Sequence, residues 1–309
     1  MNQFFTVDIL TTTIASGIAL ATPFLLAALG ETIGQRSGVI NLGVDGIMLL
    51  GAFSTYYVQL QTGNLLLAVL AGTLTGTLMG VVTAFVSVTL KAEQGISGIG
   101  VYLFGLGISS LLFQKLVGTP LPISTLPAVG IPLLDSIPLV GGIFNQSLLV
   151  YLAFLLVPVV TFVLNRTTYG LQIRAVGENP AAADSLGVSV ARIRWSTVIL
   201  GCTFAGLAGA SLLMYGGIFQ INLTQSEGFI AVALVYFGAW RPVGVMFGSL
   251  LYGLVGVVIL EWKSLGIIPL SASDLAATAP AVITVLALLF LARRFRQPAV
   301  LGRPYEREG

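Results

Sequence analysis

Long apolar runs recur along the whole chain, and short polar stretches separate them. A helix needs about 20 apolar residues to cross the hydrocarbon core of a bilayer. Nine runs reach or approach this length, and they predict an all-α, polytopic membrane protein with about nine transmembrane helices. The predicted spans are 7–29, 39–60, 64–90, 96–115, 147–164, 196–219, the short run 228–240, 243–261 and 275–292.

Three longer polar segments lie between or after the spans. Residues 118–146 hold five prolines, which end any helix and predict a folded external loop. Residues 165–195 are too polar to enter lipid and too few to form a domain, so we expect a cytoplasmic loop there. Residues 293–309 form a basic cytoplasmic tail. No segment is long enough for a soluble domain, so residues 1–309 are expected to form a single transmembrane domain.

The basic residues orient these segments across the membrane. When residues 165–195 are placed in the cytoplasm, all but two of the 14 Lys and Arg residues fall on that side, and the exceptions are Lys115 and Lys263. Such an excess marks the cytoplasmic side. It puts the C-terminus in the cytoplasm and, with nine spans, the N-terminus outside. No Lys or Arg precedes Arg36, so we interpret the first span as a retained helix rather than a secretory signal.

Composition agrees with lipid as the solvent and argues against several kinds of chemistry. Hydrophobic residues make up 56% of the 309 positions and charged residues 8%, against about 25% charged in a soluble domain. The net charge of +2 does not indicate nucleic acid as a partner. The chain has no histidine and a single cysteine, Cys202. We therefore expect no histidine-based catalytic set, no zinc site and no cofactor.

The stretch GVINLGVDGIMLLG, residues 38–51, carries two polar side chains, Asn41 and Asp45, on a glycine-rich backbone. Asp45 lies about six residues past the predicted inner boundary, or roughly 9 Å at 1.5 Å per residue. Gly43 and Gly46 weaken the helix, and a broken helix at this depth frees backbone groups to meet a polar ligand. We interpret these four residues as lining a translocation pathway or fixing a gate. The alternative is that Asp45 hydrogen-bonds the freed backbone and holds the fold together.

A second short segment, QSEGFIAVALVYFGAW at 225–240, has similar features. It begins with Glu227 followed by Gly228 and ends in a Gly-Ala-aromatic triplet, as the first stretch has Asp45 followed by Gly46 and then Gly-Ala-Phe. Interrupted segments at corresponding positions of two halves are typical of a repeat with the pathway between them. The pattern favours a two-fold internal repeat and adds Glu227 to the pathway, with chance similarity as the alternative because the spacing differs.

Glycine spacing elsewhere predicts close helix packing. Gly72, Gly76 and Gly80 form a doubled GxxxG pattern, which lets helix backbones approach in lipid. The segment 95–107 holds five glycines. Close packing is the favoured interpretation there too, and a bent or unwound helix beside the pathway is the alternative.

The predicted cytoplasmic loop contains a short helix. Asn179 and Pro180 have the residue types of a helix start, the run 180–186 is rich in alanine, and Gly187 ends it. A helix this short is not stable alone, so something should bind it. A flat alanine surface fits a protein socket. The alternative is a helix lying on anionic lipid, with nearby arginines touching the headgroups.

Three segments, in order, resemble the permease subunits of bacterial ABC importers. They are GETIGQRSGVINLGVDGIMLLGAF, YGLQIRAVGENPAAADSLGVSVARIR and GFIAVALVYFGAWRPVGVMFGSLLYG. The closest branch is the simple-sugar and nucleoside permeases, relatives of the branched-chain amino acid and ribose permeases. The resemblance covers nearly the whole chain. The family commonly has Glu where this chain has Asp45, so the carboxylate is kept on a side chain one methylene shorter.

The resemblance implies a transport subunit rather than an enzyme, in a bacterial inner membrane. Such a subunit moves a small polar solute, a nucleoside or simple sugar, into the cytoplasm by alternating access. The implied partners are ABC ATPase subunits that hydrolyse ATP, a second permease, the same or homologous, and an extracytoplasmic substrate-binding protein. The loop helix would be the coupling helix, seated in a groove of the ATPase. Its predicted residues are Gly177, Glu178, Asn179, Pro180, Ala181, Ala182, Asp184 and Gly187.

Other transport mechanisms stay open at this point. An ion-coupled secondary transporter would use an intramembrane carboxylate, and Asp45 is the candidate. An intramembrane enzyme would need a catalytic set, and none is visible. A passive channel would leave the loop helix without a purpose. The absence of a GxxxxGK[ST] sequence means that this chain does not bind ATP by a Walker motif, so the energy for import would come from another chain.

Overall fold

The computed structural model describes residues 7–132, 135, 141–269, 272, 275–276, 278–291 and 296–306. Parts of three predicted segments lie outside these residues: 133–134 and 136–140 of the external loop, 277 and 292 of the last span, and 293–295 and 307–309 of the basic tail.

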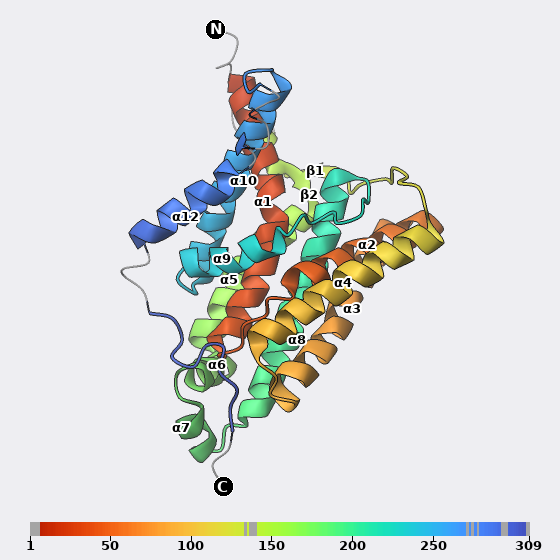
Figure 1. The fold of residues 1–309 in the computed structure, drawn as a ribbon. Helices are drawn as coiled ribbons and strands as arrows, with labels where there is room; N and C mark the ends of the chain where they lie inside the picture. Colours follow the sequence, from red (N-terminus) through yellow and green to blue (C-terminus); the bar gives the residue numbers. More distant parts are fainter. Residues whose placement is uncertain are drawn as a thin grey trace.

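The described residues fold almost entirely into helices (Figure 1). The helices are α1 Val7–Arg36, α2 Val44–Thr62, α3 Leu65–Ala84 with a π-helical turn at Phe85–Thr89, α4 Gln94–Leu116, α5 Leu148–Arg166, α6 Thr168–Glu178, α7 Pro180–Ser185, α8 Val190–Gly216, α9 Gly228–Phe237, α10 Pro242–Ser264 and α12 Ala279–Leu291. The all-α prediction is confirmed, apart from one small hairpin.

Six helices of the described part are long and apolar enough to cross a membrane: α1, α3 with its π-helical turn, α4, α5, α8 and α10. The chain is therefore a multi-pass membrane protein. The predicted count of nine included α2, α9 and α12, which are not among these six. The ten residues of α9 rise only about 15 Å at 1.5 Å per residue, half the thickness of the hydrocarbon core.

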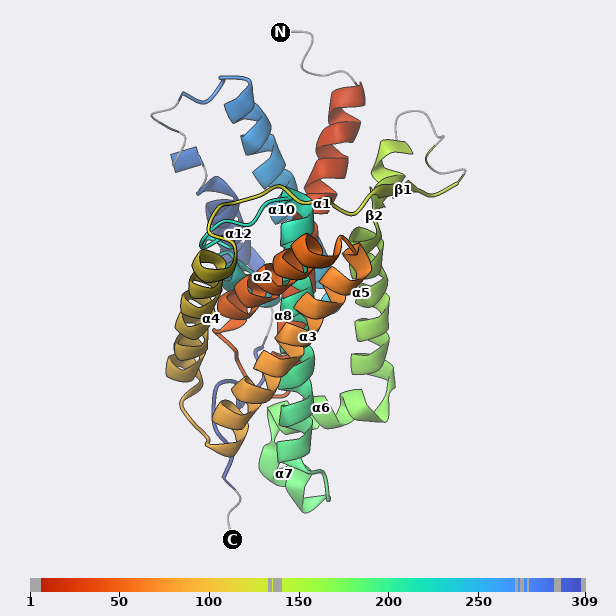
Figure 2. The ribbon, with the colours of Figure 1, turned by 90° about the vertical axis from the view of Figure 1, so that its right-hand side faces the viewer.

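Helix α8 lies at the centre of the molecule, and α1, α2 and α3 pack around it (Figure 2). The contact with α2 and α3 is made through glycines. A Cβ atom on Gly206 of α8 would lie 2.7 Å from the Cα atom of Gly76 in α3, and one on Gly51 of α2 would lie 2.6 Å from the Gly206 carbonyl oxygen. The backbones therefore touch, as the glycine spacing predicted.

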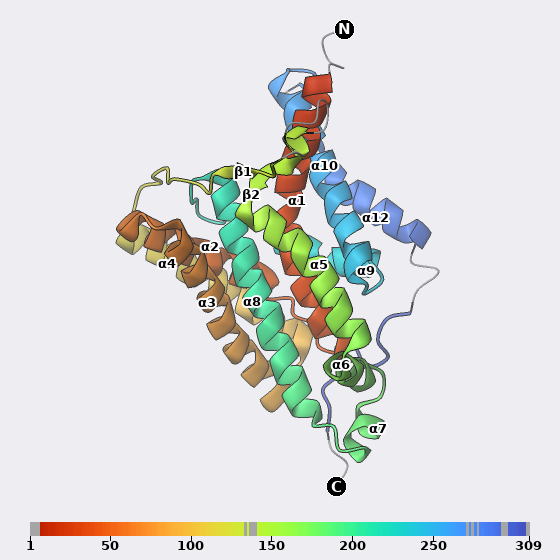
Figure 3. The ribbon, with the colours of Figure 1, turned by 180° about the vertical axis from the view of Figure 1, so that it is seen from behind.

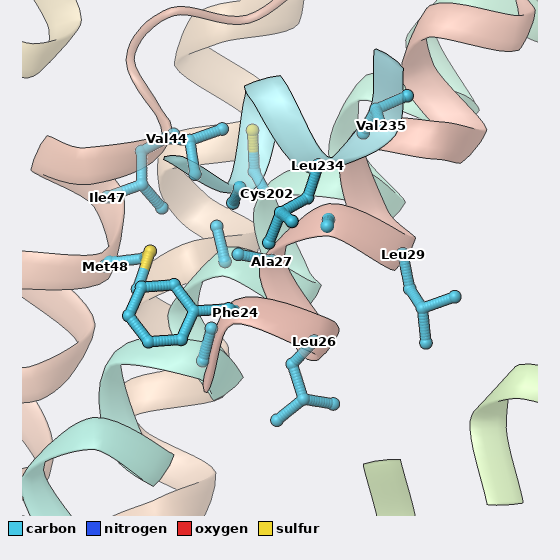
Figure 4. Packing of buried hydrophobic residues seen from close by; sticks show 14 of the residues in the cluster. Phe24, Leu26, Ala27, Leu29, Val44, Ile47, Met48, Cys202, Leu234 and Val235 are labelled. Carbon is cyan, nitrogen blue, oxygen red and sulfur yellow. The ribbon is translucent and has the colours of Figure 1, made fainter. Parts of the chain in front are cut away.

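The largest apolar cluster forms where α1, α2, α8 and α9 meet (Figure 4). Phe24 of α1 is 1% exposed, and Met48 of α2 and Leu234 of α9 are fully buried. Cys202 of α8 is a buried free thiol in the same cluster. This core lies between the two ends of the molecule and fixes how the starts of α2 and α9 face each other.

The Pro-rich external loop is folded in its described part. Its strands β1 Ala128–Gly130 and β2 Asn145–Ser147 pair antiparallel, with Ala128 opposite Ser147. The hydroxyl of Tyr151, in the first turn of α5, donates to the Val129 carbonyl at 2.8 Å. The hairpin lies beside the start of α5, whereas α6 follows the other end of that helix (Figure 3).

Three predicted helix ends were wrong by five residues or more, and one alternative was not borne out. Helix α2 begins at Val44 rather than at 39, because the residues before it form a non-helical turn. Helix α1 continues to Arg36, seven residues past its predicted end, because Glu31 is buried with polar partners and does not end the helix. Helix α8 begins at Val190 rather than at 196. Helix α4 is continuous through its glycines, which supports close packing: a Cβ on Gly98 would meet the Leu42 backbone, and one on Gly105 the Gly46 backbone.

Candidate functional site

The turn before α2 is shaped by its own polar side chain. Gly38 has a φ of +87°, a conformation that glycine adopts without strain. The Asn41 side-chain oxygen accepts a hydrogen bond from the Gly43 backbone N–H at 2.9 Å, as in an Asx turn. Its amide nitrogen donates to the Cys202 sulfur of α8 at 3.4 Å. Asn41 is therefore used to hold the non-helical segment against α8, and α2 starts directly afterwards.

Asp45 joins the start of α2 to the start of α9. Its side chain is fully buried. One carboxylate oxygen accepts from the Gly228 backbone N–H at 2.7 Å, and the other accepts from the Thr224 hydroxyl at 2.9 Å. Gly228 is the first residue of α9, where backbone N–H groups lack helical partners and the helix dipole favours a negative charge. The carboxylate thus stabilises the end of a second helix, 183 residues further along the chain.

The segment that leads into α9 has an unusual backbone. Asn222, Gln225 and Ser226 have φ values of +58°, +46° and +68°, which non-glycine residues rarely adopt. The hydroxyls of Ser226 and Tyr102 of α4 are 3.4 Å apart, and the Tyr102 ring packs edge-on against Phe229 of α9 with centroids 5.3 Å apart. Surrounding contacts of this kind maintain a backbone conformation that costs free energy, and residues in such conformations cluster at functional sites.

Glycines bring α2, α4 and α9 into backbone contact at this junction. A Cβ on Gly228 would clash with the Asp45 backbone, and one on Gly46 would lie 2.7 Å from the Tyr102 Cα atom. A Cβ on Gly43 would lie 2.6 Å from a Val101 methyl group. A larger residue at any of these positions would push two helices apart, so the glycines serve close approach rather than helix breaking.

All five predicted pathway residues, Asn41, Gly43, Asp45, Gly46 and Glu227, lie at or beside this junction. Glu227 is the N-cap residue of α9, and its charge interacts with that of Asp45. The two acidic positions that the sequence comparison paired are therefore neighbours in space. What the junction does during transport remains a prediction.

A further buried carboxylate was not predicted from the sequence, which pointed to Asp45 and Glu227 only. Glu31 of α1 is 2% exposed. It accepts from the Gln35 side chain at 3.3 Å and the Asn41 backbone N–H at 3.4 Å. The Trp240 indole N–H donates to the other end of Gln35 at 2.9 Å. The signal that could have found Glu31 is its spacing of four residues from Gln35, which puts both on one helix face.

This polar network connects the end of α1 to the turn between α9 and α10. Arg36 donates through Nε to the Trp240 carbonyl at 2.9 Å. Ala239 and Trp240 both have positive φ values, +54° and +56°. The end of α1 is thus attached on one side to the turn before α2 and on the other to the turn after α9.

The predicted loop helix exists as α7, within one residue of its expected bounds. The Asn179 side chain caps it by accepting from the Ala182 backbone N–H at 3.0 Å, and Pro180 is its first residue. Gly187 follows with a φ of +85°. Leu186, between the helix and this glycine, is 84% exposed, more than any other large apolar side chain in the described residues.

Helix α6, which precedes α7, was not predicted from the sequence. It begins after the cap residue Thr167, whose hydroxyl accepts from the Gly170 backbone N–H at 3.0 Å. Gly177 near its end packs against the backbone of Arg36, where an added Cβ would clash. The base of α7 is therefore held directly on the end of α1, and α6 and α7 together form one end of the molecule (Figure 3).

The described tail, residues 296–306, crosses this end of the molecule and is called the tail segment below. Its backbone N–H groups donate to the carbonyls of Gly177 (from Val300, 3.2 Å) and Gly38 (from Gly302, 3.0 Å). The Tyr305 hydroxyl donates to Asp184 of α7 at 3.2 Å. Two further contacts complete the attachment: Arg194 of α8 donates to the Arg303 carbonyl at 2.9 Å, and Lys91 pairs with Glu306 at 3.6 Å.

Most of the chain is similar in sequence to known proteins. The family described as branched-chain amino acid transport system / permease component matches residues 13–292. A putative glucose ABC transporter permease of Haloferax volcanii is 43% identical over 81% of this chain and 77% of its own length. A nucleoside ABC transporter permease of Lactococcus lactis is 34% identical over 95% of both chains. A guanosine ABC transporter permease of Bacillus subtilis is 32% identical over 97% of this chain and 98% of its own. No solved structure matches the chain significantly.

Proposed function

Because the chain belongs to the family of permease components of branched-chain amino acid transport systems, we propose that it is the permease subunit of an ATP-driven importer of nucleosides or simple sugars. The observation that carries this function is the end-to-end similarity to permeases named for nucleoside and guanosine transport. A relative named for glucose supports sugars as the second solute class. Such a subunit is a transport component rather than an enzyme, so ATP is hydrolysed by a separate chain.

The assembly that follows has ABC ATPase subunits on the cytoplasmic side, a second permease that is the same or homologous, and an extracytoplasmic substrate-binding protein. The chain lies in the cytoplasmic membrane with α6, α7 and the C-terminus inside. The six long helices, together with α2, α9 and α12, would make nine crossings. An odd number of crossings puts the two ends of the chain on opposite sides of the membrane, which agrees with the positions of the start of α1 and the tail segment (Figure 1). The facing acidic starts of α2 and α9 support a two-fold internal repeat.

Helix α7 is the proposed element that binds the ATPase. A six-residue helix does not persist unsupported, yet most of α7 is exposed, with only Ala183 buried. The adjacent Leu186 projects from the surface, as expected of an anchor that fills a pocket of a partner. The proposed coupling residues are Gly177, Glu178, Asn179, Pro180, Ala181, Ala182, Asp184 and Gly187, and Leu186 joins them.

A continuous set of contacts leads from α7 to the α2–α9 junction. Movement of α7 acts on Gly177, which presses on the Arg36 backbone at the end of α1. From there the turn at 38–43 leads into α2, and Asp45 transmits the displacement to α9. The energy comes from the different affinities of the partner for the two conformations. In this scheme Asp45 fixes the gate by holding two short helices together, and the junction lines the pathway.

The test is a mild-detergent pulldown of the full chain with its co-purifying ATPase. Leu186→Ser is expected to abolish ATPase recovery and uptake while the chain stays in the membrane at its normal level. Burying a leucine contributes about 1.5–3 kcal/mol, so its loss weakens binding by roughly 10-fold to 150-fold. Leu171→Ser on α6 is the matched control, because Leu171 is also exposed, at 58%, but lies outside α7.

Two results would count against this function. Equal recovery of the ATPase with Leu186→Ser and Leu171→Ser would remove α7 as the coupling element. A chain that co-purifies with no ATPase, and transports with only an ion gradient, would overturn the importer itself. The ion-coupled alternative has little support, because both oxygens of Asp45 are already engaged in holding α9.

A further inference from the structure

A groove of about 650 Å³ runs between α5 and α10 on the outer surface of the helix bundle. Its apolar part includes Phe154, Phe162 and Met246, whereas its end nearest α6 is polar and includes Asn165 and Arg166. No pathway or coupling residue named above lines it. It is therefore a separate feature of the membrane-facing surface.

The length of the groove corresponds to one leaflet of a bilayer. From Phe154 to Arg166, α5 rises over 12 residues, or about 18 Å at 1.5 Å per residue. Half of a hydrocarbon core of about 30 Å is about 15 Å. The apolar part thus faces the acyl-chain region, and Arg166, the last residue of the helix, reaches the headgroup level.

Positive charge is concentrated at the polar end. Arg174 donates to the groove-lining Asn165 at 3.4 Å, which holds a second guanidinium group at the polar end of the groove. Arg174 and Arg241 are also close enough to Arg36 to repel its charge, and the Glu178 carboxylate attracts it. No described carboxylate lies within 4.0 Å of Arg166 or Arg174. This end of the groove therefore attracts an anion.

We propose that the groove is a binding site for one anionic phospholipid. One of its acyl chains lies along α5 and α10, and its phosphate is bound by Arg166 and Arg174. A basic site between helices on one membrane face is suited to an acidic headgroup. A second copy of the chain suits it less well, because a two-fold axis along the membrane normal would bring two Arg166 side chains toward each other. The proposal requires a membrane location only, and it does not depend on the solute or on the ATPase.

The test uses the full chain in vesicles of phosphatidylcholine with one-fifth phosphatidylglycerol. Native mass spectrometry then counts the lipids that stay bound after release in mild detergent. The wild type is expected to retain one phosphatidylglycerol preferentially. Arg166→Gln should reduce that preference about fivefold, the equivalent of about 1 kcal/mol for one cation near an anionic headgroup. Arg192→Gln is the control, because Arg192 is exposed in the first turn of α8 at the same end but does not line the groove.

A second variant tests the apolar part. Val243→Trp places a large ring in the groove at a side chain that is 43% exposed, so the fold should tolerate it. It is expected to remove the bound lipid, whatever its headgroup. Equal losses with Arg166→Gln and Arg192→Gln would overturn the proposal in favour of diffuse surface charge. Cross-linking of two copies through Val243→Cys would overturn it in favour of a permease contact.

Discussion

The Asp45 carboxylate is expected to stabilise the protein mainly through its contacts with α9, and two substitutions separate this role from its charge. Asp45→Ala removes both acceptors and leaves the Gly228 N–H and the Thr224 hydroxyl unpaired in a buried site. Hydrogen bonds to a charged group contribute about 1.5–3 kcal/mol each. The expected loss of stability is therefore about 3–5 kcal/mol, allowing for partial relaxation.

Asp45→Asn should cost much less. The amide oxygen can still accept from the Gly228 N–H, and the amide nitrogen can donate to the Thr224 hydroxyl, which rotates to accept. What is lost is the negative charge at the helix start, worth about 0.3–1 kcal/mol, with up to about 2 kcal/mol where it is partly buried. Thr224→Val is an intermediate case, because it removes one of the two bonds and keeps the side-chain shape.

The measurements are unfolding in detergent and uptake into vesicles with the partner proteins present. We expect stability in the order wild type, Asp45→Asn, Thr224→Val, Asp45→Ala, with uptake following stability. If Asp45→Ala proved as stable as Asp45→Asn, the contacts with α9 would not be what the carboxylate contributes. If Asp45→Asn were stable but inactive, the charge itself would act in transport.

Three further predictions test other parts of the structure. Gly228→Ala should destabilise the chain by about 1–3 kcal/mol, because the new methyl group meets the Asp45 backbone. Gly100→Ala on α4 adds a methyl group in open space, so it should be neutral or stabilising by up to about 1 kcal/mol. Thermal unfolding distinguishes the two variants. Deletion of residues 296–309 should speed hydrogen exchange in α6 and α7, because the tail contacts are lost, and unchanged exchange would mean that the tail only lies on the surface. Two backbone N–H groups of α4 hold the pKa of Glu93 below its usual value. The stabilisation from this cap is therefore complete above about pH 4.5 and is lost as the pH falls through the lowered pKa, so hydrogen exchange at the start of α4 should become faster in acid. Glu93→Gln should remove this dependence on pH.

Features that depend on local energetics could be predicted from the sequence. The cost of placing polar groups in lipid acts on each run separately, so the long helices α3, α4 and α5 were found close to their observed bounds. Helix α7 was found because its cap residues Asn179 and Pro180 act within one turn. Asp45 was singled out for the same reason, since a charge in an apolar run is costly wherever its partner lies.

Features that depend on distant partners could not be predicted. Nothing near Asp45 in the sequence indicates that Gly228 supplies its N–H group. The end of α1 was placed seven residues too early, and the partner of Gln35 in its last turns, the Trp240 indole, is 205 residues away in the sequence. The contacts of the tail segment join Gly302 to Gly38 and Tyr305 to Asp184. No local sequence pattern predicts either of these two contacts. Sequence periodicity identifies the helices, but their polar connections are fixed only by the fold.

The glycine contacts around α8 also bear on how the protein is made. Gly76 of α3 meets its partner, Gly206, only after another 130 residues have been synthesised. At about 5–20 residues per second, that delay is about 7–26 s. During this interval α2 and α3 must wait in the membrane with their glycine faces open to lipid. The first half of the chain therefore cannot reach its final packing during its own insertion, and these glycine contacts close only after α8 has been inserted.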